Sequence, residues 1–143
     1  MSDRYRLQVK THFDAAHHIR DYRGKCSRPH GHRWEVEAVI EGARLDHRNM
    51  LMDFSVVKQA ITDILDELLD HYDLNERLNE PNVTAEYLAR FLYLELSRKL
   101  LDTPAFLECH GKLSRITIWE SPECCVKYYQ LPMKEANHDA SSK

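Results

Sequence analysis

A short segment near the N-terminus has residue types suited to binding a metal. It reads Cys26-Ser27-Arg28-Pro29-His30-Gly31-His32, with two histidines separated by a single glycine. In an extended chain this spacing puts both imidazoles on one face, and Gly31 leaves room for a close approach. Cys26 precedes His30 across a turn that contains proline. Its sulfur is therefore either a further metal ligand or a nucleophile or base beside the metal.

Two predicted strands position these histidines. Residues 5–17 alternate between apolar and polar side chains; the apolar face ends in His17, whereas the polar face continues into His18. We therefore predict that His17 is the functional member of this pair. A second alternating segment starts at His30 and places His30 and His32 on its apolar face. Three neutral imidazoles suit a zinc ion that keeps an open coordination position, as catalytic sites do.

The segment between the two strands, residues 18–29, is predicted to be a loop because it is polar and contains Gly24 and Pro29. This loop is basic, although the whole chain has a formal net charge of −3. Its cationic residues are Arg20, Arg23, Lys25 and Arg28. Two interpretations stay open, a solvated loop or a surface that attracts a phosphorylated substrate.

Two amphipathic helices are predicted in the middle of the chain. Residues 53–55, Asp-Phe-Ser, cap the first, whose apolar positions run through residues 57–69. Residues 81–84, Pro-Asn-Val-Thr, form a turn and an N-cap for the second, whose apolar positions run through residues 87–100. Both apolar stripes are expected to pack in the core.

Polar residues at the ends of these helices can be interpreted either as functional groups or as residues that only stabilise the helix ends. Asp70 and His71 are neighbours after the first helix, where a carboxylate can hold the imidazole in one tautomer. A histidine at a helix C-terminus is also favoured by the helix dipole without any chemistry. Thr84 is expected to cap the second helix, and Glu86 in its first turn suits the dipole there.

The C-terminal part is predicted to be a hairpin of residues 112–120 and 124–131 around a Ser-Pro-Glu turn. Ile116, Ile118 and Glu120 share one face, so a carboxylate ends a buried row. A buried carboxylate needs hydrogen-bond donors, and an aminopyrimidinone ring offers two adjacent N–H groups at the right spacing.

Length and composition limit the remaining possibilities. The chain has 143 residues, 43% of them hydrophobic, so we expect one folded domain over residues 1–132 and a flexible polar tail over residues 133–143. Its charge argues against nucleic acid or an anionic membrane as a partner. It has neither a signal peptide nor a run approaching the roughly 20 apolar residues of a membrane span, so we expect a cytoplasmic protein. The four cysteines include no C-x-x-C pair and are expected to be reduced.

Six motifs in chain order resemble the 6-pyruvoyltetrahydropterin synthase and 6-carboxytetrahydropterin synthase family over about residues 5–130. The cysteine spacing is similar to that of the 6-carboxytetrahydropterin synthase branch of queuosine biosynthesis, whereas in the pyruvoyl branch the cysteine stands further from the histidine pair. A related folate-pathway branch has glutamate in place of Cys26. Ala85, Ser121 and the doubled histidine at His18 depart from the family pattern. The motifs are Phe13-Asp14-Ala15-Ala16-His17, Cys26-x-x-x-His30-Gly31-His32, Met52-Asp53-Phe54, Leu69-Asp70-His71-x-x-Leu74-Asn75, Pro81-Asn82-x-Thr84-x-Glu86 and Trp119-Glu120-Ser121-Pro122.

The resemblance implies a zinc site with an open position. His17, His30 and His32 would hold zinc, which would take the side-chain oxygens of 7,8-dihydroneopterin triphosphate and stabilise enolate-like charge. Cys26 would be the general base rather than a ligand, because nearby zinc and histidine should lower the pKa of a thiol.

The resemblance also assigns roles to the remaining candidates. Asp70 and His71 would form an acid/base relay. Glu120 would anchor the pterin ring, with Thr84 and Glu86 at the edge of the pocket. The expected products are 6-carboxy-5,6,7,8-tetrahydropterin, acetaldehyde and triphosphate.

The family's fold is an α+β tunnelling fold, and the resemblance implies the same here. It is a four-stranded antiparallel sheet with two helices on one face in the order ββααββ. Subunits join their sheets into barrels, usually as hexamers of two trimers, and sites form between subunits, so His71 or Glu120 would act on a neighbour's zinc. Two alternatives remain. One is a pyruvoyl-type synthase that stops after triphosphate elimination, and the other is a non-catalytic, zinc-stabilised pterin-binding protein in which Cys26 is a structural fourth ligand.

Overall fold

The computed structural model describes residues 1–133, so the expected tail lies outside the described residues from residue 134 on. The two long helices and four strands follow the predicted order ββααββ, with two short helices and one 3₁₀ turn added. The elements are β1 (Tyr5–His17), the 3₁₀ turn (Lys25–Ser27), β2 (His30–Gly42), α1 (Phe54–Leu68), α2 (Leu74–Arg77), α3 (Ala85–Leu101), α4 (Pro104–Glu108), β3 (Lys112–Ser121) and β4 (Cys124–Tyr128).

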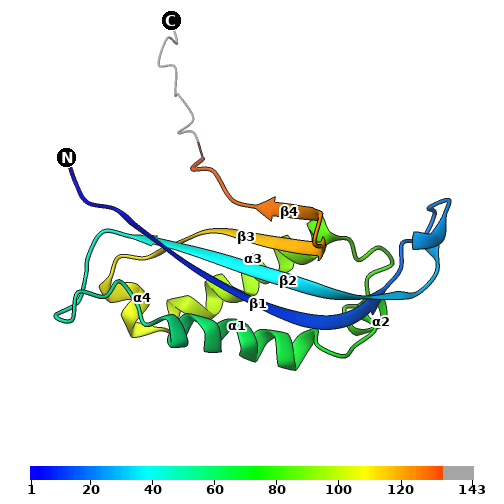
Figure 1. Cartoon of the computed structure of the whole chain (residues 1–143), viewed down its shortest axis with the longest axis horizontal. Coiled ribbons are helices and arrows are strands. Elements are labelled where there is room, and N and C mark those ends of the chain that lie inside the picture. Colours follow the sequence, from blue (N-terminus) through cyan, green and yellow to red (C-terminus); the bar gives the residue numbers. More distant parts are fainter. Residues whose placement is uncertain (134–143) are drawn as a thin grey trace, which may run out of the picture.

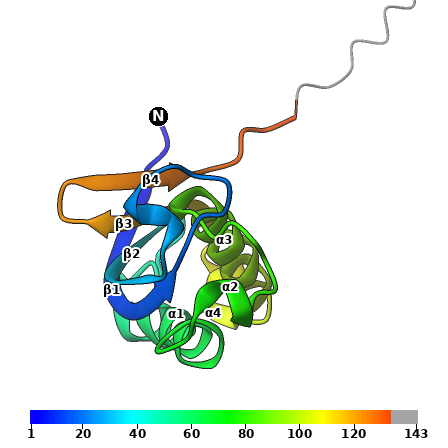
Figure 2. The ribbon, with the colours of Figure 1, turned by 90° about the vertical axis from the view of Figure 1, so that its right-hand side faces the viewer.

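The four strands form one antiparallel sheet in the order β1-β2-β3-β4. Helices α1 and α3 cover one face of this sheet, so sheet and helices make two layers (Figures 1 and 2). β4 ends at Tyr128, before the predicted Leu131. Its last partner on β3 is Ile116, and the pairing of β3 with β2 becomes irregular just beyond that point, between Val39 and Ile40.

The core lies between the sheet and the helices. Alternation predicts this face: the buried side chains of β1 include Phe13 and His17, whereas those of β2 include Trp34. Leucines of α3, among them Leu88 and Leu92, pack against them. Burial of one side chain of this size contributes roughly 1.5–3 kcal/mol, so the core holds the strand ends in place against the helices.

The opposite face of the sheet is polar. Ion pairs between strands cross it, such as the bond from Arg33 Nε to Asp14 Oδ1 at 3.0 Å and that from Lys10 Nζ to Glu35 Oε2 at 2.9 Å. Side chains on this face are therefore separated from the helical layer by the sheet itself. Within residues 1–133, no helix is long and apolar enough to cross a membrane.

The two short helices were not predicted from the sequence. α2 and α4 are too short to show an apolar period, and the side chain of Asp73 caps α2 by accepting the N–H groups of Asn75 and Glu76. The segment around α2 lies beside the end of β1. Ala16 forms a parallel bridge with Asp73, and Ile19 forms an antiparallel bridge with Asn82.

Candidate metal centre

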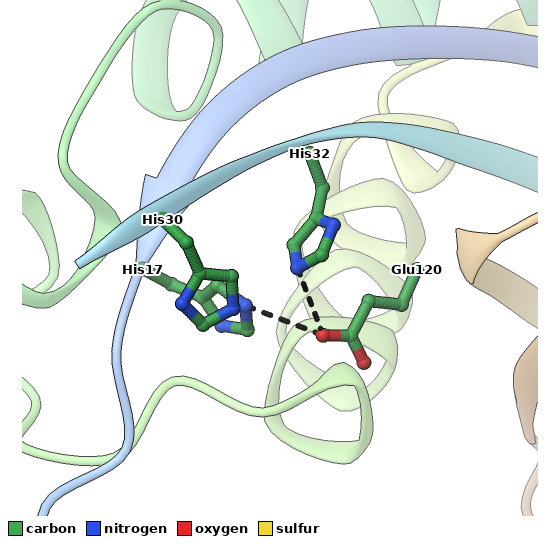
Figure 3. A group of neighbouring side chains, drawn as sticks. All are labelled: His17, His30, His32 and Glu120. Carbon is green, nitrogen blue, oxygen red and sulfur yellow. Dashed lines mark ion pairs between the residues drawn. The ribbon is translucent and has the colours of Figure 1, made fainter. Parts of the chain in front are cut away.

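Three histidines and one glutamate meet where β1 ends and β2 begins (Figure 3). His17 and His30 are directly paired across the two strands, and His32 lies opposite Ala15. Glu120 reaches the same point from β3. One ligand atom from each of the four side chains lies within 4.8 Å of the others. The antiparallel register therefore brings together residues that are far apart in the sequence.

Backbone carbonyls set the tautomers of two of these histidines. His17 Nδ1 lies 2.7 Å from the carbonyl oxygen of Val83, and His30 Nδ1 lies 2.7 Å from that of Arg28. A carbonyl oxygen only accepts hydrogen bonds, so in both rings Nδ1 carries the proton and donates it. In the neutral form of each ring, Nε2 then has a free lone pair that faces the cluster. Metal-binding histidines are oriented in this way by a partner on the other ring nitrogen.

Burial disfavours the charged form of two of the three imidazoles. Burial is the main cause that lowers the pKa of both His17 and His32 below the usual range of histidine. Trp34 is fully buried beneath them, with ring centroids 4.8 Å from His17 and 5.3 Å from His32. The indole limits how far either ring can rotate, so these two side chains of the cluster are held in place.

The cluster fits a metal ion. Nε2 of His17 and Nε2 of His32 are buried and have no hydrogen-bond partner in the described part of the chain. Buried polar atoms are rarely left unpaired, and each such atom calls for an explanation. Neutral imidazole nitrogens and a carboxylate oxygen are a donor set that zinc accepts. A divalent ion held there would polarise oxygen atoms of a bound molecule.

Asn75 supports this centre, although sequence reasoning assigned it no role. Its side chain is buried and makes three hydrogen bonds: Oδ1 accepts the N–H of His18, and Nδ2 donates to the carbonyls of His18 and Pro81, all between 2.8 and 2.9 Å. It thus ties the residue after His17 to the turn that carries Val83. The only signal in the sequence was its place in the motif that ends Leu74-Asn75.

Cys26 lies outside the metal cluster. It is half-buried in the 3₁₀ turn between β1 and β2, and its carbonyl accepts the N–H of Ile19 at 2.8 Å. That bond ties the loop to the end of β1. The group of potential ligand atoms contains no sulfur within residues 1–133. Whether the thiol is a base or a ligand stays a prediction.

The basic side chains of the same loop are exposed. Among the described residues, none of the four forms an ion pair with an acidic side chain. The loop is anchored where Arg20 N–H donates to Asn82 Oδ1 at 2.7 Å. These cations, Arg20, Arg23, Lys25 and Arg28, are therefore free to bind an anion on the loop that joins the two histidine-bearing strands.

Asp70 and His71 form a pair away from the cluster. His71 follows the end of α1 and has a φ of 63°, and this turn brings its Nδ1 to 2.9 Å from Asp70 Oδ2. Asp70 Oδ1 accepts the N–H of Asp14, and the N–H of His71 donates to the carbonyl of Asp14. The pair thus borders the free edge of β1, with the His71 side chain 79% exposed. The structure does not bring it to the histidines of its own chain.

Thr84 and Glu86 follow Val83, whose carbonyl oxygen contacts His17 of the cluster. Thr84 caps α3, its hydroxyl accepting the N–H of Tyr87 at 3.1 Å. Glu86 is exposed in the first turn of the same helix. Because Val83 orients His17, the start of α3 is fixed relative to the cluster. The role of both side chains toward a substrate stays a prediction.

Comparisons of the sequence and of the fold with known proteins lead to the same family. The model of the 6-pyruvoyl tetrahydropterin synthase family matches residues 6–130. The chain is 35% identical over 127 residues to the 6-carboxy-5,6,7,8-tetrahydropterin synthase of Bacillus subtilis, covering 87% of this chain and 84% of that protein. It is 28% identical over 133 residues to the protein of that name in Rickettsia bellii, covering 80% and 93%. The 6-pyruvoyl tetrahydropterin synthase of Caenorhabditis elegans has the same fold, with a TM-score of 0.74 at 20% identity over 91% of this chain and 98% of that one.

Proposed function

The chain belongs to the 6-pyruvoyl tetrahydropterin synthase family, and we propose that it is a zinc-dependent 6-carboxy-5,6,7,8-tetrahydropterin synthase. In this proposal it converts 7,8-dihydroneopterin triphosphate to 6-carboxy-5,6,7,8-tetrahydropterin, acetaldehyde and triphosphate, in the cytoplasm and on the route to queuosine. The observation that carries the proposal is the three-histidine cluster with its glutamate. The names of the curated relatives support the product.

The three histidines would hold the metal. His17 and His30 present unprotonated Nε2 atoms, because their Nδ1 protons are donated to backbone carbonyls. Zinc bound there would supply the Lewis acid that polarises the hydroxyl and carbonyl oxygens of the substrate side chain. His32 would be the third metal ligand, two residues after His30 on the same face of β2.

Cys26 would move protons of the substrate. It is half-buried on the loop that joins the two metal-binding strands and is not among the clustered ligand atoms, which suits a base that acts beside the metal. As a thiolate, its Sγ would take a proton from a side-chain carbon of the pterin. The exposed cations of the same loop would hold the triphosphate, whose oxygen leaves with the electron pair when the carbon–oxygen bond breaks.

The second acid/base pair would serve a neighbouring subunit. Asp70 Oδ2 lies 2.9 Å from His71 Nδ1, so the carboxylate would hold a proton on that nitrogen and leave His71 Nε2 to exchange one. Because the pair is exposed at the free edge of β1, we propose that it meets the zinc centre of another copy in a homohexamer of two trimers. Glu120, Thr84 and Glu86 would bind the pterin ring, through acceptors that match its N–H groups.

Identification of products tests the proposal. Purified, zinc-loaded protein is incubated with 7,8-dihydroneopterin triphosphate, and pterins and acetaldehyde are measured by mass. We expect 6-carboxy-5,6,7,8-tetrahydropterin and acetaldehyde in equal amounts, and neither from the His17→Ala variant. A 6-pyruvoyl product without acetaldehyde would assign the pyruvoyl-type reaction instead. Unchanged substrate would favour the non-catalytic, pterin-binding alternative.

A further inference from the structure

The carboxylate of Glu120 lies where a fourth metal ligand would lie. Its Oε1 is 3.1 Å from His32 Nε2 and 3.3 Å from His17 Nε2. Around a tetrahedral zinc with bonds of about 2.0–2.1 Å, adjacent ligand atoms are roughly 3.3–3.4 Å apart. The contacts of Glu120 with both rings therefore have the length of tetrahedral edges (Figure 3).

Neither contact of Glu120 has the geometry of a hydrogen bond in the described part of the chain. Both Nε2 atoms lack a hydrogen-bond partner within residues 1–133, although the glutamate oxygen is near enough to be one. His17 Nδ1 lies 2.7 Å from the carbonyl oxygen of Val83, so in the neutral form of the ring the proton lies on Nδ1 and Nε2 has none to donate to Glu120. A carboxylate oxygen and an imidazole lone pair repel each other at this distance unless a cation lies between them.

Glu120 is also free to move away from the histidines. The pairing of β3 with β4 is irregular between Trp119 and Ser121, which leaves Glu120 out of the regular register. Its side chain is 32% exposed, and in the described part of the chain its carboxylate has no partner besides the two histidines. Rotation about its side-chain bonds meets no competing interaction there.

We propose that Glu120 is a displaceable fourth ligand, which closes the metal site in the substrate-free protein and is released when a pterin side-chain oxygen takes its place. The open coordination position expected of a three-histidine site would then arise only when the substrate displaces Glu120. In the substrate-free protein, Glu120 rather than water would occupy it. The released carboxylate becomes available to accept the N–H groups of the pterin ring. The identity of the displacing molecule rests on the proposed function, whereas the ligation itself rests on the geometry of the four side chains.

Cobalt substitution tests this proposal without measuring turnover. Cobalt(II) absorbs visible light with an intensity and shape that depend on its ligands and coordination number, so the spectrum reports on the fourth position. The wild type is compared with Glu120→Ala, with the isosteric Glu120→Gln and with Glu123→Ala, which removes an exposed carboxylate from the neighbouring turn. Far-UV circular dichroism verifies the folding of each variant. Zinc affinity is measured by competition with a chromogenic chelator.

We expect both Glu120 variants to change the cobalt spectrum of the substrate-free protein and to weaken zinc binding by at least about tenfold. Glu123→Ala should match the wild type in both measurements. Addition of 7,8-dihydroneopterin, which lacks the triphosphate, should change the wild-type spectrum. Identical spectra and zinc affinities in the wild type and the Glu120 variants would overturn the proposal while leaving the proposed reaction intact. Failure of the wild type to bind either metal would overturn both.

Discussion

Replacement of Asn75 by alanine should weaken both the fold and the metal site. The side chain is 8% exposed and makes three hydrogen bonds to backbone groups, two with His18 and one with Pro81. Each such bond contributes about 0.5–1.5 kcal/mol, and the backbone groups left unpaired lose solvation as well. We therefore expect Asn75→Ala to lower the free energy of unfolding by roughly 2–4 kcal/mol, a large share of the 5–15 kcal/mol typical of a domain.

The same variant should bind zinc less tightly. Asn75 joins the residue after His17 to the turn whose Val83 carbonyl orients the imidazole of His17. Loss of this support should cost about tenfold in zinc affinity, as loss of partners behind metal ligands does elsewhere. Urea unfolding of the metal-free protein gives the first quantity, and chelator competition gives the second.

Two further variants sharpen the test. Asn82→Ala removes one exposed bond, from the N–H of Arg20, and should cost less than about 1 kcal/mol. Asn75→Asp keeps the acceptor for His18 but points an anion at two carbonyl oxygens, so at neutral pH it should be no milder than Asn75→Ala. A loss below about 1 kcal/mol in Asn75→Ala, or unchanged zinc affinity, would refute the view that Asn75 supports the centre.

Three other predictions concern the loop, the relay and the buried thiol. Refolding equal amounts of Cys26→Ala and His71→Ala chains together should restore about a quarter of wild-type activity. If each site takes Cys26 from one subunit and His71 from another, random mixing leaves both residues intact in about one site in four. No recovery of activity would place the whole site within one chain. Each variant alone should keep its zinc and lose turnover, and loss of metal and fold in Cys26→Ala would instead make the thiol a structural ligand. Exchange of Arg23 and Lys25 for glutamine should raise KM for the triphosphate and flatten its dependence on salt, whereas an unchanged salt dependence would show that the loop is merely solvated. Burial raises the pKa of the Cys109 thiol, so a thiol reagent should modify it far more slowly than the other three cysteines until the protein is unfolded, and equally fast reaction of all four would contradict its burial.

Strand parity predicted much of the fold and the meeting point of the histidines. Alternation with period two is local, so it can be read from the sequence of a single strand. It distinguished the buried face that ends in His17 from the face that continues into His18, and it put His30 and His32 on one side of β2. Antiparallel pairing of two such strands then requires their histidines to converge.

Features that depend on irregular backbone could not be predicted in this way. Asp70 and His71 meet because a residue with positive φ follows α1, and no periodicity encodes that turn. The path of Glu120 depends on the irregular pairing at the end of β3, which sequence alternation does not show. The contact between Asp70 and His71 therefore arises outside the helix, after the end of α1.

The metal site also depends on groups that carry no sequence signal at all. The tautomers of His17 and His30 are set by carbonyl oxygens of Val83 and Arg28, and a carbonyl is present whatever the side chain. What places the Val83 carbonyl is the turn before α3, which Thr84 caps and Asn75 ties to β1. The cap that starts a core helix thus also prepares a histidine for metal. A substitution that shifts this turn should affect metal binding even though it leaves every ligand in the sequence, because the orientation of His17 comes from the backbone of a different element.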